Sequence, residues 1–499
     1  MANNILGISA HYHNAAVSLL KDGKLIAAAE EERFSRIKHD PSMPKAATRY
    51  CLREAGLTMA DIDCVAYYEL PVKKLGRQLW MGLPGFSRRP DEINRMDPHR
   101  AEREIREILG FDGPIEFVEH HLAHAASAYH FSGFQEAAIL TVDGVGEWTT
   151  TSYGQGDGQN LKLFEEVEFP NSIGLLYSTL TSYLGFRVNG GEYKVMGLAP
   201  YGQPRYAEQI RAMIPIEAGG QYRLDMRFFD FLNNERMYSD ALISAFGLPP
   251  REPEGEMTPF HMDVASSLQT VLNEIMLAKV RYLHERVPSE NLCLAGGVAL
   301  NCVANRYLHA NGPFRNLFVQ PAANDAGGAL GAASMAHIRR FNTPLPNTRL
   351  ANVFLGPNYS NAEIERMLAS TPLQYEDFRG QSNALFDKVA AAMEAGKVVG
   401  WFQGRMEFGP RALGARSILA DPRSPLMRDH INALVKKREA FRPFAPSVLE
   451  ENMTDHFLLQ SPSPFMLGTC QVNSALDLPA ITHVDGSARV QTVNSHDNP

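Results

Sequence analysis

The chain has 499 residues, which is too long for one hydrophobic core and predicts two or three domains. Its content of 44% hydrophobic and 21% charged residues is that of an ordinary globular protein. The formal net charge of −8 argues against nucleic acid as the main partner, because nucleic-acid phosphates bind basic surfaces.

The cysteine content and the hydropathy of the sequence indicate the cellular compartment of the protein. The five cysteines include no CxxC pair, which argues against a disulfide scaffold or a cysteine–zinc site and fits a reduced cytoplasm. No apolar run reaches the ~18 residues of a membrane span, and no signal segment opens the chain. We therefore expect a cytoplasmic protein without a membrane partner.

Two segments share one strand pattern. Residues 4–34 contain an apolar strand, a short polar turn, a second strand, an Asp-Gly hairpin signal and a third strand, and residues 137–168 repeat this order. Helical segments follow each copy. The alternative is that two unrelated α/β hairpins look alike. We interpret the similarity as an internal repeat and predict a duplicated α/β fold around an ATP cleft.

Residues 118–147 carry the clearest chemical signal. His120 and His124 stand four apart in an Ala-rich segment, so one helix face would carry both imidazoles. Asp143 ends an apolar strand, and Asp325 stands at a Gly-rich turn. A His/His/Asp/Asp set suits Fe(II), Mn(II) or Zn(II). A zinc peptidase is excluded because His121 replaces the Glu of HExxH; packing or solvent-facing histidines remain the alternative.

Glycine-rich stretches suggest nucleotide contacts. Residues 188–202 are predicted to be a Gly-rich loop that lacks the GKS/GKT ending of a Walker A element, and Lys194 within it is either a phosphate ligand or a solvated lysine. Residues 292–308 read as a buried strand, a Gly296–Gly297 turn and a helix start, an arrangement that lets a nucleotide approach the backbone. Residues 45–60, 98–110, 172–186 and 261–285 are predicted to be helices.

The segment 341–360 is rich in Pro and Asn and is the predicted domain boundary. After it we expect a helix at 383–395 and a strand at 398–404. A basic stretch follows, with Arg405, Arg411, Arg416, Arg423, Lys436, Lys437, Arg438 and Arg442. Such a concentration in an acidic protein suits phosphate or carbamate recognition. A solvated basic face is the alternative, although the interleaved aromatic residues argue for partly buried arginines.

Several motifs together resemble those of the O-carbamoyltransferases, which include the nodulation-factor and antibiotic-tailoring enzymes. The similarity covers essentially the whole chain, and the motifs occur in the family's order. They are HHLAHAASA, TVDGVGE, EYKVMGLAPYG, AGGVALN, ANDAGGALGAA, FGPRALGARSILADPR and KKREAFRPFAPSVL.

The resemblance implies a fold and a reaction. Residues 1–340 would form a duplicated actin-like ATP-binding domain similar to the tRNA threonylcarbamoyl transferase. Residues 361–499 would form a smaller α/β domain similar to the threonylcarbamoyl-adenylate synthase, after a linker at 341–360. In the family, carbamoyl phosphate and ATP give carbamoyl adenylate, and the carbamoyl group then passes to a hydroxyl of a small-molecule acceptor. A homodimer is the one oligomeric assembly that we consider.

The resemblance also implies roles for individual residues. The metal set would bind Fe(II), with another divalent metal as the alternative, and Mg would accompany ATP. Catalytic residues would be His13 and Lys38 near the acceptor, with His11 competing for the role of base, and Arg411, Lys436 and Arg442 in adenylate formation. Nucleotide-binding residues would be Lys194, Gly197, Gly296, Gly297, Asn301, Gly327, Gly328 and Arg489.

One departure from the family concerns the C-terminus. Family members usually continue past DGSARVQTV with a further strand–loop region, whereas this chain ends at Pro499. Either the C-terminal domain is shortened or the sequence is a piece of a longer chain, and an incomplete domain would argue against carbamoyl-adenylate synthesis. Two other functions compete with small-molecule carbamoylation: carbamoylation of tRNA or a protein group, and a nucleotide-binding sensor without turnover.

Overall fold

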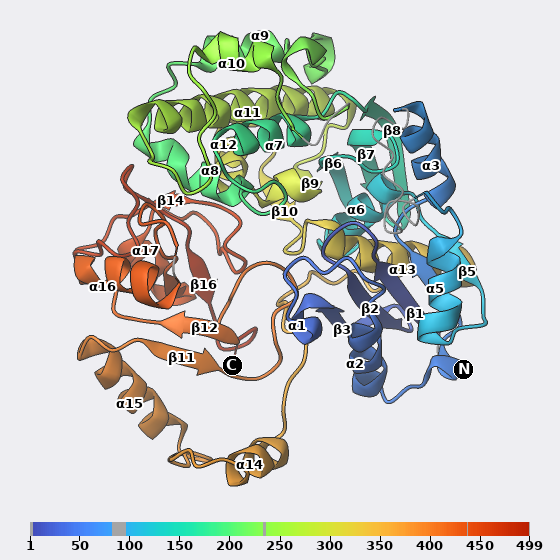
Figure 1. The fold of residues 1–499 in the computed structure, drawn as a ribbon. Coiled ribbons are helices and arrows are strands. Elements are labelled where there is room, and N and C mark those ends of the chain that lie inside the picture. The colour runs from blue at the N-terminus through green and yellow to red at the C-terminus, as the bar shows by residue number, and fades with distance from the viewer. Residues whose placement is uncertain (1–2, 82–95, 233–235, 437, 499) are drawn as a thin grey trace. The chain divides into compact units, whose positions relative to one another are not determined.

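A computed structural model describes residues 3–81, 96–232, 236–436 and 438–498 (Figure 1). The chain divides into two compact units, Met1–Ala351 and Asn352–Pro499, which we call the N-terminal and C-terminal units. The division falls within the Pro- and Asn-rich segment 341–360.

The first sheet of the N-terminal unit is built around a completely buried central strand. Its strands are β1 (Asn4–Ser9), β2 (Ala16–Lys21), β3 (Lys24–Glu30), β4 (Cys64–Tyr67) and β5 (Ile115–Phe117). They lie in the order β3-β2-β1-β4-β5. Strand β1 pairs antiparallel with β2 and parallel with β4. The apolar residues of β1 therefore face helices or sheet neighbours on every side, which explains its continuous apolar sequence.

The second sheet has the same arrangement. Its strands are β6 (Glu136–Val142), β7 (Thr149–Asp157), β8 (Asn160–Glu168), β9 (Asn291–Ala295) and β10 (Asn316–Val319), in the order β10-β9-β6-β7-β8. Strand β6 pairs antiparallel with β7 and parallel with β9. The segments predicted as two copies thus form the three-stranded antiparallel part of each sheet. The N-terminal unit is a mixed α/β fold.

Most of the predicted helices are present. The N-terminal unit contains, within the described residues, α1 (Glu32–Ser35), α2 (Lys45–Ala55), α3 (Pro71–Trp80), α5 (Arg100–Leu109), α6 (His120–Tyr129), α7 (Ile173–Tyr183), α8 (Glu192–Leu198), α9 (Ala207–Met213), α10 (Asp240–Phe246), α11 (Pro259–Arg286), α12 (Cys302–Asn311) and α13 (Asp325–Phe341). Helix α2 ends earlier than predicted because Gly56 adopts a left-handed conformation (φ 66°) that caps it.

The prediction of a loop at residues 188–202 was wrong. The segment contains helix α8 and a short 3-10 helix at Ala199–Tyr201. The residues between the glycines, Glu192 to Met196, have enough helix propensity to form a turn and a half once Val195 and Met196 are buried in the core.

Helices α6 and α13 pack against each other between the two sheets (Figure 1). Helix α13 also contacts β1, β2 and β4, and α6 contacts β6 and β9. Small residues allow this close contact: a Cβ added at Gly331 of α13 would lie 1.7 Å from the carbonyl oxygen of Ala123 in α6. The glycine therefore sets the distance between the helices.

The C-terminal unit has shorter elements. Those described are α14 (Asn361–Ala369), α15 (Ser382–Glu394), β11 (Val399–Phe402), β12 (Arg416–Leu419), α16 (Pro425–His430), β13 (Ser447–Leu449), α17 (Met453–His456), β14 (Cys470–Gln471), β15 (Ser487–Ala488) and β16 (Gln491–Val493). Helix α15 and strand β11 confirm the predictions for residues 383–395 and 398–404. The strands form three two-stranded sheets, β11-β12, β13-β16 and β14-β15.

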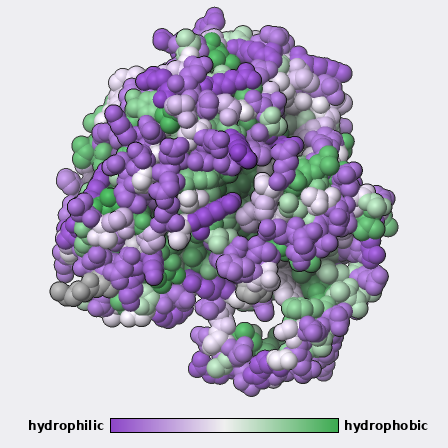
Figure 2. All heavy atoms as spheres, turned by 180° about the vertical axis from the view of Figure 1, so that it is seen from behind, coloured by the Kyte–Doolittle hydropathy of each residue, from purple (hydrophilic) through white to green (hydrophobic). Residues whose placement is uncertain are grey.

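The described helices include none that combines the length and apolarity needed to cross a membrane. On the face drawn in Figure 2, hydrophilic residues dominate and apolar residues lie in small, separate patches. Scattered exposed apolar residues of this kind are ordinary for a protein surface in water.

Replacement of Gly331 by Ala tests the helix contact. The new methyl group would overlap the Ala123 carbonyl, so α6 and α13 must separate, and we expect the free energy of unfolding to fall by about 3 kcal/mol. Urea unfolding followed by circular dichroism measures this change. Gly76→Ala is the matched control, because its Cβ would find its nearest neighbour 4.0 Å away. Equal stability of the Gly331→Ala protein and the wild type would contradict the contact.

Candidate functional site

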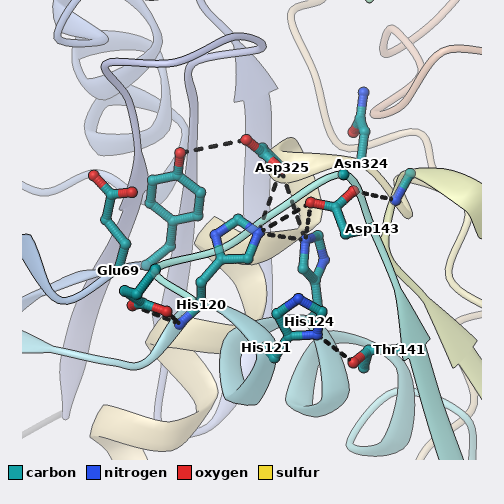
Figure 3. A network of polar contacts seen from close by, with 12 residues as sticks. Glu69, His120, His121, His124, Thr141, Asp143, Asn324 and Asp325 are labelled. Carbon is teal, nitrogen blue, oxygen red and sulfur yellow. Dashed lines mark hydrogen bonds and ion pairs between the residues drawn. The ribbon is translucent and has the colours of Figure 1, made fainter. Parts of the chain in front are cut away.

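Four side chains from three elements converge at one end of the contact between α6 and α13 (Figure 3). His120 and His124 lie one turn apart on α6, Asp143 follows β6, and Asp325 is the first residue of α13. One potential ligand atom from each residue lies within 4.8 Å of the others. The structure thus brings together all four residues that the sequence predicted as a metal set.

The distances suit a shared cation. The Nε2 atoms of His120 and His124 lie 3.0 Å apart, and Asp143 Oδ2 lies 3.3 Å from His120 Nε2. Asp325 Oδ1 lies 3.8 and 3.7 Å from the two Nε2 atoms. Ligands about 2.0–2.2 Å from one metal ion stand about 3–4 Å from each other. Two imidazole nitrogens and two carboxylates are ligands for borderline divalent metals such as iron, manganese or zinc.

Burial supports the same interpretation. The side chains of His120, His124 and Asp325 are at most 3% exposed, whereas that of Asp143 is 13% exposed. Asp325 Oδ1 is buried without a hydrogen-bond partner among the described residues. A buried carboxylate oxygen without a partner is costly, and a cation between the four side chains would satisfy it. The residues present therefore fit a metal ion, and Asp143 marks the side from which a ligand can reach it.

The charges of the cluster hold both carboxylates ionised. Burial alone would raise the pKa of Asp325, but the neighbouring side chains of His13, His124 and His120 outweigh it and lower that pKa. Burial would lower the pKa of His120, but the hydrogen bond to Asp143 and the charge of Asp325 outweigh it and raise the pKa to about 9. Without a metal, His120 therefore binds a proton near neutral pH, and metal binding must displace it.

Glu147 holds the start of α6 in place beside the cluster. Its buried carboxylate accepts hydrogen bonds from the backbone N–H groups of Leu70 (2.7 Å) and His120 (3.0 Å). This places a carboxylate at the N-terminus of the helix, where it is favoured. Between Asp143 and Glu147 stands Gly146, where a Cβ would come within 3.0 Å of the His120 ring. The spacing of TVDGVGE serves this geometry, although sequence analysis gave Glu147 no role.

The structure separates the two histidines considered for the role of base. His13 Nδ1 lies 3.7 Å from Asp325 Oδ2, next to the cluster. His11 instead bonds Glu104 through Nε2 (2.9 Å) and the Tyr67 hydroxyl through Nδ1 (3.0 Å). Both ring nitrogens of His11 are therefore engaged in holding the loop, whereas His13 lies beside the cluster.

Other predicted residues lie outside the four-residue cluster. His121 turns away from it, toward the Thr141 hydroxyl at 2.6 Å (Figure 3). The Lys38 ammonium lies over the Tyr193 ring at 5.7 Å, and the Lys194 ammonium lies over Phe186 at 5.5 Å. Gly197 is on helix α8 with Lys194.

The predicted nucleotide glycines have two different environments. Gly296 has φ +89°, and a Cβ there would lie 2.3 Å from the Val142 carbonyl oxygen, so only glycine fits this turn after β9. The N–H of Gly297 donates to Asp143 Oδ1 at 2.8 Å and links the turn to the cluster. By contrast, Gly327 and Gly328 pack against the Ala322 carbonyl and the Tyr68 ring.

Asn301 follows the Gly296–Gly297 turn and caps α12 by accepting the N–H of Ala304 at 2.9 Å. Its amide also exchanges hydrogen bonds with Gln269 of α11. This contact orients the turn against the long helix.

The basic residues of the C-terminal unit form a group of their own. Asn432 links two of them, because its Oδ1 accepts a hydrogen bond from Arg438 Nε at 2.7 Å and its Nδ2 donates to the Arg442 carbonyl at 3.0 Å. Desolvation, followed by the charges of Arg438 and Arg442, lowers the pKa of Lys436. The Nε atoms of Arg411 and Arg489 are buried. Lys437, also part of the predicted basic stretch, lies outside the described residues.

Comparison with known proteins decides the family. The family model of the carbamoyltransferase N-terminus matches residues 4–79 and 102–334, and that of the carbamoyltransferase C-terminus matches residues 390–499. The chain belongs to the carbamoyltransferase family. It is therefore an enzyme of the transferase class, as the resemblance of its motifs predicted.

Relatives of this carbamoyltransferase span nearly its whole length. An uncharacterized protein of Synechocystis is 44% identical over 99% of this chain and 87% of its own. Nodulation protein NolNO of Sinorhizobium fredii is 39% identical over 97% of this chain and 70% of its own. Nodulation protein U of Rhizobium tropici is 30% identical over 97% of this chain and 84% of its own.

Metal analysis of purified protein tests the cluster. We expect one divalent metal ion per chain in the wild type and a large loss in His124→Ala, because three ligands no longer enclose the ion. Inductively coupled plasma mass spectrometry measures both the amount and the element. His130→Gln is the control, since His130 is a buried histidine that bonds Ser334 outside the cluster. A folded His124→Ala protein with full metal content would contradict the assignment.

Proposed function

We propose that this carbamoyltransferase is ATP-dependent, forms carbamoyl adenylate from carbamoyl phosphate and ATP, and transfers the carbamoyl group to a hydroxyl of a small-molecule acceptor. The observation that carries the proposal is the position of His13 beside a buried His/His/Asp/Asp cluster, in a chain of this family. A proton acceptor next to a metal site is what transfer to a hydroxyl requires.

The two similar sheets support nucleotide binding in the N-terminal unit. In both, the central strand has one antiparallel and one parallel neighbour, and a further strand continues each side with the same pairing. We infer a duplicated, actin-like ATP-binding domain from this repetition. The turn at Gly296–Gly297 is held beside Asp143 by the Gly297 N–H, so a phosphate bound over this glycine turn would lie next to the metal set. Lys194, Gly197, Asn301, Gly327 and Gly328 remain our candidates for further nucleotide contacts.

In the transfer step, the acceptor oxygen attacks the carbamoyl carbon, and the bond from that carbon to the phosphate oxygen of AMP breaks. His13 would take the proton of the attacking hydroxyl, with Asp325 beside it to stabilise the imidazolium that forms. A divalent metal held by the four residues, which we propose to be Fe(II), would stabilise negative charge on the departing phosphate. Lys38 is proposed to contribute near the acceptor.

Adenylate formation is proposed for the C-terminal unit. Carbamoyl phosphate and ATP, with Mg, are both anionic, and the neighbouring cations Lys436, Arg438 and Arg442 offer the complementary charge. Arg411 lies in a loop that is held by hydrogen bonds to one side chain. The buried carboxylate of Glu407 accepts the backbone N–H groups of Leu413, Ala415 and Arg416. Arg489 is the remaining candidate in this unit.

Loss of His13 should separate the two steps. We expect His13→Ala to slow carbamoyl transfer by roughly 10²–10⁴-fold, because the hydroxyl loses its proton acceptor, while carbamoyl-phosphate-dependent pyrophosphate release from ATP continues. Transfer is measured by mass spectrometry of the acceptor, found by screening hydroxylated metabolites. His11→Ala, which disrupts the loop as a whole, is the comparison. Equal loss of both steps in His13→Ala would indicate a structural role.

Loss of Arg411 tests where the adenylate is made. We expect Arg411→Ala to abolish carbamoyl-phosphate-dependent pyrophosphate release and Arg411→Lys to restore little of it, because lysine lacks the planar fork of arginine. Given chemically prepared carbamoyl adenylate in a short assay, Arg411→Ala should still carbamoylate the acceptor. Arg366→Ala, on the exposed face of α14, is the control. A wild-type protein without pyrophosphate release would contradict the proposed reaction and favour a nucleotide-binding sensor.

A further inference from the structure

A buried imidazole nitrogen without a partner lies close to the proposed base. His39 Nδ1 lies 3.1 Å from the side-chain Nδ2 of Asn14, the residue that follows His13. The Nε2 atom of His39 is buried and has no hydrogen-bond partner among the described residues. Such an atom is costly, because it loses its hydration without replacement. The proposed chemistry gives His39 no role.

The contact with Asn14 determines which ring nitrogen of His39 carries the proton. The Nδ2 group of an asparagine amide donates and does not accept, so Nδ1 of His39 accepts and Nε2 keeps the proton. Burial, followed by the charge of Lys38, lowers the pKa of His39, although Glu32 opposes them. The imidazole is therefore neutral near neutral pH, and its Nε2–H is a donor that lacks an acceptor.

The backbone holds this imidazole in a fixed place. His39 has φ 58°, in the left-handed region that is uncommon for residues with a side chain. Its N–H donates to Glu32 Oε2 at 2.7 Å. The backbone N–H of Ala15 donates to the Asp40 carbonyl at 2.9 Å, which ties the loop of His13 to the segment of His39. The two histidines therefore keep a fixed relation, as groups that act on one substrate must.

A glycine leaves room at the free donor. A Cβ added at Gly190 would lie 3.4 Å from His39 Nε2, so the Nε2–H faces a position where this chain has no side-chain atom. The φ of Gly190 lies outside the left-handed region, so the backbone does not require glycine there. The absence of a side chain leaves space for one ligand atom beside the donor.

The proposed transfer step needs a donor of this kind. When the acceptor oxygen attacks the carbamoyl carbon, the π electrons of the carbonyl move to its oxygen, and they return as the bond to the phosphate oxygen of AMP breaks. His13 is assigned the proton of the hydroxyl, and the metal set is assigned the phosphate. The carbonyl oxygen, which gains negative charge, has no donor yet. Fixed donors at such an oxygen supply a large part of catalysis.

We propose that His39 is a further catalytic residue, whose Nε2–H donates a hydrogen bond to the carbamoyl oxygen in the space beside Gly190. A neutral imidazole suits this role, because it polarises a carbonyl group and keeps its own proton. The inference rests on the proposed function, since the carbamoyl group comes from the proposed intermediate. The polarisation of a bound carbonyl group, however, can be measured without turnover.

Kinetic variants separate the donor from a structural role. His39→Asn keeps an acceptor for Asn14 but removes the donor, and we expect transfer from prepared carbamoyl adenylate to slow roughly 10²–10³-fold with little change in the KM of the acceptor. His39→Gln, whose amide N–H can reach the Nε2 position, should recover about tenfold of this loss. His309→Asn, at a half-buried histidine of α12, is the matched control and should transfer as the wild type does.

Gly190→Ala tests the same interaction with His39 intact. The new methyl group would occupy the place of the carbamoyl oxygen, while its 3.4 Å distance from Nε2 is an ordinary contact that the free protein tolerates. We expect transfer to slow as in His39→Asn. The double variant should be no slower than the slower single variant, because both changes remove one interaction.

Infrared spectroscopy of a bound analogue provides a measurement without turnover. The probe is the methylene analogue of carbamoyl adenylate, in which CH₂ replaces the oxygen between the carbonyl carbon and phosphorus, with ¹³C in the carbonyl group. A hydrogen bond to the oxygen weakens the C=O bond. We therefore expect the carbonyl stretch at a lower frequency in the wild type than in His39→Asn or Gly190→Ala.

The possible failures are distinct. An equal carbonyl frequency in the wild type and His39→Asn, or wild-type transfer in a folded His39→Asn protein, would overturn the role of His39 and leave the proposed function intact. Failure of the analogue to bind would overturn both. Conversely, a frequency shift that depends on His39 and Gly190, in a protein without pyrophosphate release, would support the donor and refute the proposed synthesis of the intermediate.

Discussion

The close contact of α6 with α13 is the constraint on which the site depends. Because Gly331 has no side chain, the Ala123 carbonyl can lie where a Cβ would stand, and the two helices begin at the same place beside the end of β6. His120 and Asp325, the first residues of the two helices, thereby meet Asp143. The N-terminal ends also favour the carboxylates gathered there, since Asp325 lies in the first turn of α13 and Glu147 accepts the first N–H of α6.

Local rules were sufficient to predict the parts of the metal cluster that lie close together in the sequence. Two histidines four apart in a helix-forming segment must share a face, and a carboxylate at the end of an apolar strand was expected at a site. The repeated strand pattern of residues 4–34 and 137–168 likewise gave the antiparallel part of both sheets. The approach of Asp325 to His120 depends on how the sheets and helices pack, and the sequence suggested it only through the residue types.

Contacts between distant segments explain what sequence reasoning missed. Glu147 meets Leu70 and His120, and His39 meets Asn14, across separations that no local pattern encodes. The contacts of His11 with Glu104 and Tyr67, which set it apart from His13, could not be predicted from the sequence either. The wrong loop at 188–202 has a related cause: its glycines suggested irregular backbone, whereas burial of Val195 and Met196 stabilises helix α8 between them. In each case tertiary packing outweighed local preference.

The central claim is that one metal ion is held by the four converging side chains. Anomalous X-ray diffraction from crystals of the purified protein, recorded at the absorption edge of the metal that it carries, tests this most directly. The account predicts a single strong anomalous peak per chain, about 2.0–2.2 Å from the Nε2 atoms of His120 and His124 and from carboxylate oxygens of Asp143 and Asp325. A peak at other residues, or no anomalous peak between the four side chains in protein that carries the metal, would contradict it.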